Sequence, residues 1–252
     1  MYYFVSDIHL GSGDIAQQRR SEDAFCRWLD KVGEDAKAIY LLGDIFDFWF
    51  EYHNVVPKGY VRVLARLSEL TRRGVDVVFL TGNHDMWCYD YFERECGVKI
   101  FRKQQIVDIH GMMYHLAHGD NLNIKDKPML RAMNGFFRSK VARFIFSWLI
   151  HPDLAMKFGR WWSGKSRKSH NSDNITPESL TFLVEYARSH KAANPNIEGY
   201  IFGHMHYPYL YDSKELNILF LSDWSGKEAT YCLIDNMGNA QLKTFAIDET
   251  VS

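Results

Sequence analysis

Five short motifs in this sequence carry side chains of the kinds that bind divalent metal ions. Their candidate ligands are carboxylates, imidazoles and one carboxamide, with no thiolate among them. Such a set suits Mn²⁺, Fe²⁺ or Zn²⁺ in a catalytic site better than a structural zinc bound through cysteine sulfur. In chain order the motifs are Asp7-x-His9, Gly43-Asp44-x-x-Asp47, Gly82-Asn83-His84-Asp85, His118-Gly119-Asp120 and Gly203-His204-x-His206.

Taken together, the motifs predict a hydrolytic site with two metal ions. Two metals ~3.5–4 Å apart need a bridging ligand, and an aspartate can offer one oxygen to each. Glycines precede Asp44, Asn83 and His204, where they allow tight turns that bring ligands to one point. A single motif would be weak evidence, but five in order are strong. The other six histidines are expected to be structural: His53, His110, His115, His151, His170 and His190.

The first three motifs follow predicted β-strands. Apolar runs at residues 2–5, 38–42 and 75–80 each lead into a motif, and apolar residues recur at helical spacing over 21–33 and 58–73. This alternation predicts an α/β fold. In such sheets the loops after the carboxyl ends of the strands form the active site.

The second half of the chain continues with strands around one helix. Residues 105–109 and 112–117 predict a hairpin that leads into His118, and 199–202 predict a strand that leads into His204. Thr176-Pro177 has the residue types of a helix start. We therefore expect mixed β-sheets flanked by helices, with the site at the strand ends.

Composition indicates a folded protein that stays in a reducing compartment. The 252 residues are 46% hydrophobic, with a net charge of −1 that favours no particular partner, and we expect one domain over residues 1–252. The four cysteines form no C-x-x-C pair and no secretory leader precedes the first strand, which favours a cytoplasmic protein with reduced thiols. Apolar runs such as 144–150 are shorter than the ~18–20 residues that span a bilayer.

One segment, residues 125–170, breaks the alternation of strands and helices. It holds eleven Lys or Arg against two acidic residues, a net charge of +9 that leaves −10 for the remainder, and it is rich in Phe and Trp. We predict a basic, helical insertion. One interpretation is a lid whose apolar side takes acyl chains while its cations meet phosphates or anionic lipid. The alternative is a helical excursion whose aromatic residues simply pack on the body.

The motif series resembles that of the calcineurin-like metallophosphoesterases, D-x-H, G-D-x-x-D, G-N-H-D/E, H and G-H-x-H, from Asp7 to His206. The resemblance implies a sandwich of mixed β-sheets flanked by helices, with one metal held by Asp7, His9 and His206. The other metal would be held by Asn83, His118 and His204, and Asp44 would bridge the pair. It also implies that His84 faces the phosphate as a catalytic residue and that Asp47 orients its ring.

Within that family the chain resembles the UDP-2,3-diacylglucosamine diphosphatases of lipid A synthesis. Shared features are the opening S-D-I-H-L, the stretch G-D-I-F-D-F-W, H-G-D-x-L, the basic-aromatic insertion and Ser222-Asp223-Trp224. The resemblance implies cleavage to UMP and 2,3-diacylglucosamine 1-phosphate with two Mn²⁺ ions, at the cytoplasmic face of the inner membrane. That location implies peripheral contact with an anionic membrane surface.

This chain departs from those enzymes in two places. His84 stands where well-known members carry Arg, and Met129 stands where a Tyr is expected. The substrate contacts implied by the resemblance are Asn83, His84, Asp126, Ser163, Ser166, Arg167 and His170.

Two other functions are open on the sequence alone. A metallophosphoesterase for a soluble nucleotide or another lipid-linked diphosphate would keep every metal ligand. A non-catalytic module on the same fold would be expected to lack ligands, and none is missing. We expect no nucleic-acid partner, because the body outside the insertion is acidic. Nothing in the sequence indicates an obligate protein partner.

Overall fold

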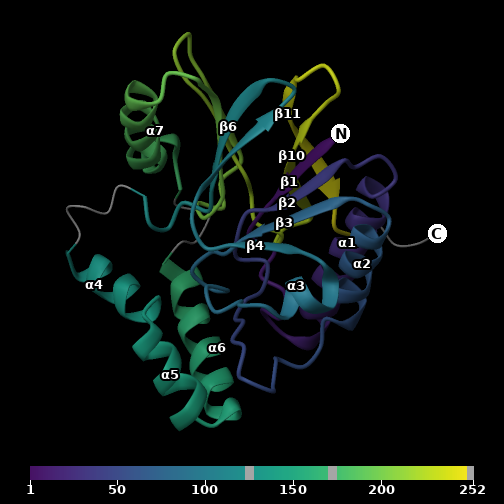
Figure 1. The fold of residues 1–252 in the computed structure, drawn as a ribbon, viewed down its shortest axis with the longest axis vertical. Coiled ribbons are helices and arrows are strands. Elements are labelled where there is room, and N and C mark those ends of the chain that lie inside the picture. Colours follow the sequence, from purple (N-terminus) through teal and green to yellow (C-terminus); the bar gives the residue numbers. More distant parts are fainter. Residues whose placement is uncertain (123–127, 170–174, 249–252) are drawn as a thin grey trace.

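Two β-sheets lie at the centre of the fold (Figure 1). The computed structural model describes residues 1–122, 128–169 and 175–248. The first sheet has the strand order β11-β10-β1-β2-β3-β4, in which β1 to β4 run parallel and β10 and β11 are antiparallel to their neighbours. Its strands are β1 (Tyr2–Val5), β2 (Ala38–Leu41), β3 (Asp76–Leu80), β4 (Lys99–Phe101), β10 (Glu228–Ile234) and β11 (Ala240–Ala246).

The second sheet has the order β5-β6-β7-β9-β8. The predicted hairpin is confirmed, because β5 and β6 pair antiparallel with Gln105 opposite Leu116. Strands β6, β7 and β9 run parallel to one another, so both sheets are mixed, as the sequence predicted. The strands are β5 (Gln105–Ile109), β6 (Met112–Ala117), β7 (Ile197–Phe202), β8 (Tyr209–Asp212) and β9 (Asn217–Phe220).

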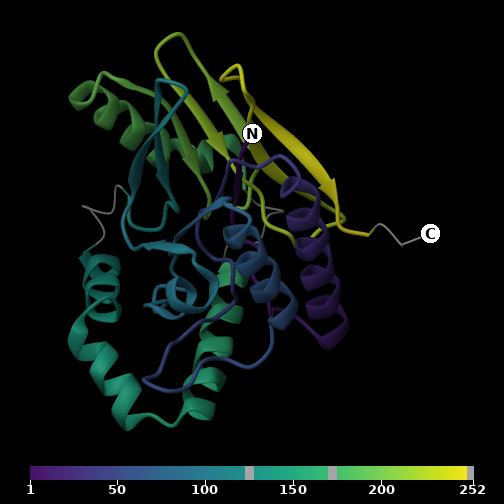
Figure 2. The same ribbon diagram turned by 45° about the vertical axis from the view of Figure 1, so that its right-hand side comes forward.

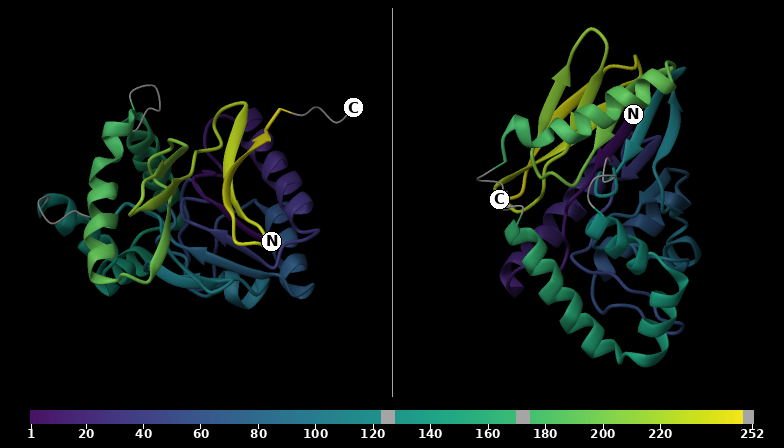
Figure 3. Two further views of the ribbon diagram at one scale, coloured as in Figure 1. Left: turned by 90° about the horizontal axis from the view of Figure 1, so that it is seen from above. Right: turned by 90° about the vertical axis from the view of Figure 1, so that its left-hand side faces the viewer.

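Helices cover the outer faces of both sheets, which gives four layers (Figure 3, left). Helices α1 (Ile15–Val32), α2 (Val61–Arg72) and α3 (Tyr91–Cys96) pack on the first sheet, and α7 (Thr181–Ala193) packs on the second. A separate apolar cluster fills the space between the sheets. Each helix layer buries one apolar face and each sheet buries two, so the predicted sandwich is confirmed.

Several element boundaries differ from the predicted ones. Helix α1 begins at Ile15 rather than near 21, because Asp14 caps it: its Oδ1 accepts a hydrogen bond from Gln17 N at 2.8 Å. The helix expected at Thr176 begins as a 3-10 turn, η2 (Pro177–Leu180), before α7. These differences leave the motifs at the strand ends.

Three helices form the described part of the basic insertion and stand beside the sandwich (Figures 1 and 2). These lid helices are α4 (Pro128–Phe137), α5 (Lys140–Leu149) and α6 (Pro152–Ser169). They are attached to the body by hydrogen bonds, for example from Trp87 Nε1 to Phe137 O at 2.7 Å and from Tyr52 OH to Ile150 O at 3.3 Å. No helix in the described ranges has the length and apolar character needed to cross a membrane.

Candidate metal centre

The five motifs meet because each follows the carboxyl end of a strand. Parallel pairing of β1, β2 and β3 places the first three motifs at one edge, and parallel β6 and β7 place the last two beside them. Main-chain hydrogen bonds tie the first two loops together, from Asp7 N to Gly43 O and from His9 N to Asp44 O, both at 3.0 Å. The predicted convergence of distant motifs therefore follows from strand order.

The backbone of the centre adopts an unusual conformation. Five of the seven expected ligands have a positive φ, between 50° and 70°. Residues other than glycine rarely adopt this region, at a cost of ~1–3 kcal/mol each, and such strain collects at functional sites. The five are Asp7, His9, Asp44, His204 and His206. The fold therefore forces these side chains toward a common point at the expense of local stability.

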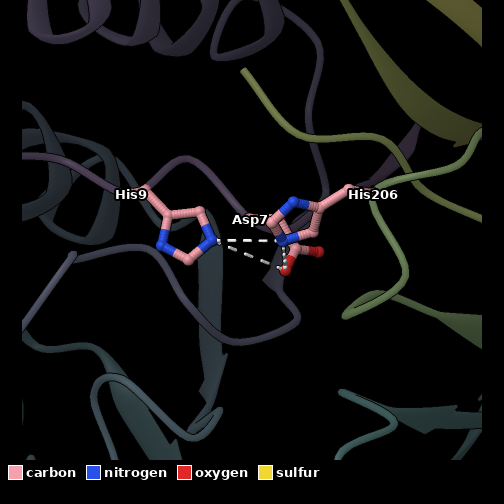
Figure 4. Close-up of side chains that lie close together, drawn as sticks. All are labelled: Asp7, His9 and His206. Carbon is pink, nitrogen blue, oxygen red and sulfur yellow. Dashed lines mark hydrogen bonds and ion pairs between the residues drawn. The ribbon is translucent and has the colours of Figure 1, made fainter. Parts of the chain in front are cut away.

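Three side chains form the first candidate ligand set, Asp7, His9 and His206 (Figure 4). The Nε2 atoms of His9 and His206 lie 3.2 Å apart, and His206 Nε2 lies 3.2 Å from Asp7 Oδ1. His9 Nε2 lies 4.0 Å from the same oxygen. Two ligand atoms ~2.1 Å from one metal and at right angles to each other stand about 3.0 Å apart, so this spacing fits a shared cation.

The second ligand set surrounds Asp44. Its Oδ2 lies 3.2 Å from His118 Nε2, which in turn lies 3.3 Å from Asn83 Oδ1. His204 belongs to the same group of converging ligand atoms. Asp44 is also grouped with His9 of the first set, so its carboxylate stands between the two sets, where a bridging ligand has to be.

The imidazole of His118, a candidate metal ligand, is held by its other nitrogen. Its Nδ1 lies 2.8 Å from Leu42 O, to which only a protonated nitrogen can donate. This hydrogen bond orients the ring and turns Nε2 toward Asp44 and Asn83. Among metal-binding histidines, this use of a backbone carbonyl is the usual way to orient the ring.

Buried carboxylates and imidazoles perturb one another strongly in the centre. Burial favours the neutral form of Asp7, yet His206 overcomes it and lowers the pKa of Asp7 to about 2. Burial likewise opposes ionisation of Asp44, but His118 and His84 hold its pKa well below the usual value. Burial would lower the pKa of His118, and Asp44 instead raises it. The two carboxylates stay ionised, and a divalent cation could replace the imidazolium protons that balance them.

Comparison with known proteins assigns the chain to a family. The sequence model of the calcineurin-like phosphoesterases matches residues 2–208.

The chain belongs to the calcineurin-like phosphoesterases.

Among curated relatives, a UDP-2,3-diacylglucosamine hydrolase of Porphyromonas gingivalis is 36% identical over 238 residues, which cover 88% of this chain and 89% of that protein. A protein of the same name from Nitrosococcus oceani is 28% identical and covers 91% and 90% of the two chains. A solved structure of Yfce, a phosphoesterase from E. coli, is 16% identical with a TM-score of 0.41, over 98% of this chain and 99% of that chain. Family membership makes the chain a metal-dependent hydrolase.

His84 of this phosphoesterase lies beside the second ligand set. Its backbone N donates to Asp44 Oδ1 at 2.9 Å, and its Nε2 lies 3.8 Å from Asp44 Oδ2. The ring is held through Nδ1, which donates to the backbone oxygen of Asp47 at 2.8 Å. Asp47 thus contacts the ring through its main chain, while its carboxylate Oδ1 lies 3.8 Å from His9 Nδ1.

One lid residue reaches the centre. Ser163 of α6 is buried, and its hydroxyl donates to Asp47 Oδ1. Ser163 also lines an aromatic pocket together with Asn83 and His84, so three of the expected substrate contacts lie together. The aromatic pocket is completed by the rings of Phe48, Trp87, Phe137, Phe158 and Trp162. Of the other expected contacts, Asp126, His170 and the side chains of Ser166 and Arg167 lie outside the described residues.

Two aspartates support the phosphoesterase centre in ways that the motif spacing does not reveal. The buried carboxylate of Asp85 accepts hydrogen bonds from Ile45 N at 2.8 Å and from Gly82 N at 2.7 Å, and so clamps two ligand loops together. Asp223 Oδ2 lies 3.6 Å from His206 Nδ1. In the sequence, both aspartates lie in stretches that resemble the family, Asp85 in the third motif and Asp223 in Ser222-Asp223-Trp224. The sequence does not show that Asp85 contacts the Asp44 loop or that Asp223 contacts His206.

Proposed function

We propose that this phosphoesterase hydrolyses the diphosphate of UDP-2,3-diacylglucosamine to UMP and 2,3-diacylglucosamine 1-phosphate. The observation that carries the proposal is an aromatic pocket, walled partly by the lid helices, that opens beside the convergent ligand sets. Curated relatives with the name UDP-2,3-diacylglucosamine hydrolase match about nine tenths of the chain, at 88% and 91% coverage. In the proposed substrate a diphosphate joins a polar nucleotide to an acylated sugar. The diphosphate would lie at the ligand sets and the acylated sugar in the aromatic pocket.

The proposed cofactor is a pair of Mn²⁺ ions. The first ion would be held by the ligand set that contains Asp7 and the second ion by the ligand set that contains His118. Asp44 would bridge the two ions. Nitrogen and oxygen donors without sulfur fit Mn²⁺ among the possible ions. When bound, the two cations would neutralise phosphate oxygens and lower the pKa of a water molecule toward ~7. The proposed ligands are Asp7, His9, Asp44, Asn83, His118, His204 and His206.

One residue is proposed to assist the bond cleavage directly, and a second to position it. Water oxygen bonds to one phosphorus, the P–O bond to the bridging oxygen breaks, and that oxygen needs a proton or a positive partner. We assign this task to His84, because the hydrogen bond from Nδ1 to Asp47 O leaves its Nε2 available beside Asp44. Asp47 is a positioning residue, since its backbone oxygen orients the ring.

The aromatic pocket is proposed to take the first part of the acyl chains. Phe48 and Trp87 from the body face Phe137, Phe158 and Trp162 from the lid helices, so apolar surface is available on both sides. Asn83, His84 and Ser163 lie at its inner end, where the sugar would sit. Asp126, Ser166, Arg167 and His170 are retained as proposed substrate contacts on the resemblance alone.

Peripheral contact with an anionic membrane surface is part of the proposal, at the cytoplasmic face of the inner membrane. On α5, Val141, Phe144, Trp148 and Leu149 are exposed, although such side chains are usually buried. The lid helices also carry exposed cations, for example Lys140 next to Val141 on α5 and Lys157 on α6. Exposed apolar side chains and cations on the same group of helices suit an anionic interface from which an acylated substrate could enter.

Release of UMP tests the function. Purified protein is incubated with Mn²⁺ and UDP-2,3-diacylglucosamine in mild detergent, and UMP is measured. The control is Asp44→Ala, which removes the shared ligand and should abolish turnover while the fold persists, as judged by circular dichroism and metal content. Hydrolysis of a soluble nucleotide or another lipid-linked diphosphate, with none of this substrate, would replace the proposal.

A further inference from the structure

A second cavity, of about 390 Å³, adjoins the ligand sets at His118. Its walls come from the end of β3, from residues 102–104 between β4 and β5, from residues 117–122 after β6, and from Arg138 between α4 and α5. It shares no lining residue with the aromatic pocket, which reaches the centre at Asn83 and His84 instead. The two spaces meet where His118 Nε2 and Asn83 Oδ1 lie 3.3 Å apart. We call this space the cationic cavity.

The charge of the cationic cavity favours an anion. Arg102, Lys103 and Arg138 line it, against one acidic residue, Asp120. Arg138 already pairs with Asp120, at 3.0 Å. Within the described part of the chain no carboxylate pairs with Arg102 or Lys103, and Arg102 donates only to the backbone oxygens of Cys88 and Tyr89. Among the described residues, the cavity therefore carries an excess of positive charge beside the proposed phosphate site.

Arg138 offers a further unused donor. One terminal nitrogen donates to Asp120 Oδ2 and the other to Arg102 O, at 3.0 and 3.3 Å. Its Nε is buried and has no acceptor among the described residues. A buried donor without a partner costs stability unless a ligand satisfies it, and a phosphate or carbonyl oxygen would do so.

The remaining lining of the cationic cavity contains no aromatic ring and combines polar residues with the aliphatic Leu80, Ala117 and Leu122. Gln104 and Asn121 carry carboxamides, each of which has a donor and an acceptor. A uracil ring presents two carbonyl oxygens and one N–H, which such groups can pair. The volume falls within the ~300–1,000 Å³ of small-molecule sites. Phe and Trp rings, on which acyl chains would pack, line the other pocket and not this cavity.

We propose that the cationic cavity binds the uridine monophosphate half of the substrate and retains UMP as a product. The inference rests on the proposed function, because it divides that substrate between two spaces. The diphosphate then lies between His84 and His118, with the sugar and acyl chains on the His84 side. The nucleotide phosphate and ribose are bound by Arg102, Lys103 and Arg138. The uracil base forms hydrogen bonds with Gln104.

Product inhibition tests the inference. The double variant Lys103→Ala/Gln104→Ala changes two exposed loop residues, and Lys214→Ala, in an exposed turn of the second sheet, is the matched control. We expect the inhibition constant of UMP to rise ~10-fold in the double variant, as for loss of charge-assisted contacts, and to stay unchanged in the control. Inhibition by 2,3-diacylglucosamine 1-phosphate should change less than twofold. Trp162→Ala in the aromatic pocket should raise the inhibition constant of 2,3-diacylglucosamine 1-phosphate and change that of UMP less than twofold.

The outcomes separate this inference from the proposed function. An unchanged inhibition constant for UMP in the double variant, or an equal rise for both products, would overturn the cationic cavity as the nucleotide site. If the wild-type protein releases no UMP from the substrate, the proposed function is refuted instead. Titration calorimetry of UMP with the Mn²⁺-loaded protein then tests whether the cationic cavity binds UMP. Weaker UMP binding by the double variant would then support it, and equal or absent binding would refute it.

Discussion

Replacement of Gly82 by alanine probes how closely the ligand loops approach each other. Gly82 precedes Asn83 and lies against the Asp44 loop. A Cβ at this position would stand 2.7 Å from Asp44 N and 2.9 Å from Asp44 Cγ, and closer still to Oδ1. Ordinary Cβ contacts begin near 3.4 Å, so the Asp44 nitrogen alone would have to withdraw by about 0.7 Å.

Asp44 has little freedom to withdraw. Its carboxylate is buried, its Oδ1 accepts from His84 N at 2.9 Å, and its backbone oxygen accepts from His9 N. A displacement of ~1 Å at a catalytic centre can cost ~10²-fold in rate. Overpacking of a filled site typically costs ~1–3 kcal/mol of stability. We therefore expect Gly82→Ala to lose ~10²-fold in kcat/KM, to bind less Mn²⁺, and to unfold at lower urea concentration.

The matched control is Gly226→Ala. Its added Cβ would meet Glu228 O at an ordinary 3.6 Å, and its backbone does not require glycine. Metal content is measured by elemental analysis after gel filtration, and turnover with a chromogenic phosphodiester and with UDP-2,3-diacylglucosamine. If Gly82→Ala matched both the wild type and the control in metal content and rate, the close packing of the two loops would have no role in the centre.

Three further predictions follow from other parts of the molecule. His84→Ala should keep both metals but lose ~10²-fold in turnover, and altered metal stoichiometry at an unchanged rate would reverse the role given to this residue. Burial, with a smaller contribution from His190, lowers the pKa of His115 from 6.5 to about 4. Between pH 6.5 and 4, His115 is therefore protonated in the unfolded chain and neutral in the folded chain. As a result, the free energy of unfolding falls by up to about 3 kcal/mol as the pH drops from 6.5 toward 4. His115→Gln should flatten this dependence in urea titrations at pH 7 and 5, and an unchanged slope would contradict it. Trp148→Ser/Leu149→Ser should reduce cosedimentation with anionic lipid vesicles several-fold, whereas Lys214→Ala should not, and equal binding by all three proteins would exclude the exposed face of α5 from the membrane contact.

The local pattern of the sequence predicted where the ligands lie along the strands. Apolar runs that end at Asp7, Asp44 and Asn83 predict buried parallel strands, and the carboxyl ends of parallel strands share one edge of a sheet. The residue types predicted a metal centre without sulfur, and the motif order indicated the family. Element boundaries were less well predicted, as at α1, because the cap at Asp14 was not recognised.

The division of the ligands into two sets came from family resemblance, not from the pattern itself. Spacing along the chain does not determine which distant side chains come within 4 Å of one another. Asp7 and His206 are 199 residues apart and their ligand atoms lie 3.2 Å apart, because β1 and β7 belong to two sheets that pack face to face.

The sequence alone determined the chemistry of the centre, since residue type and strand position are local properties. Tertiary structure decided the supporting contacts. In these, Asp85 accepts hydrogen bonds from two ligand loops, the backbone oxygen of Asp47 accepts one from the ring of His84, and the carboxylate of Asp47 accepts one from Ser163. It also decided that Arg102 and Arg138 share one cavity with His118. These contacts depend on how separate layers and the lid helices pack together, which is a property of the whole fold.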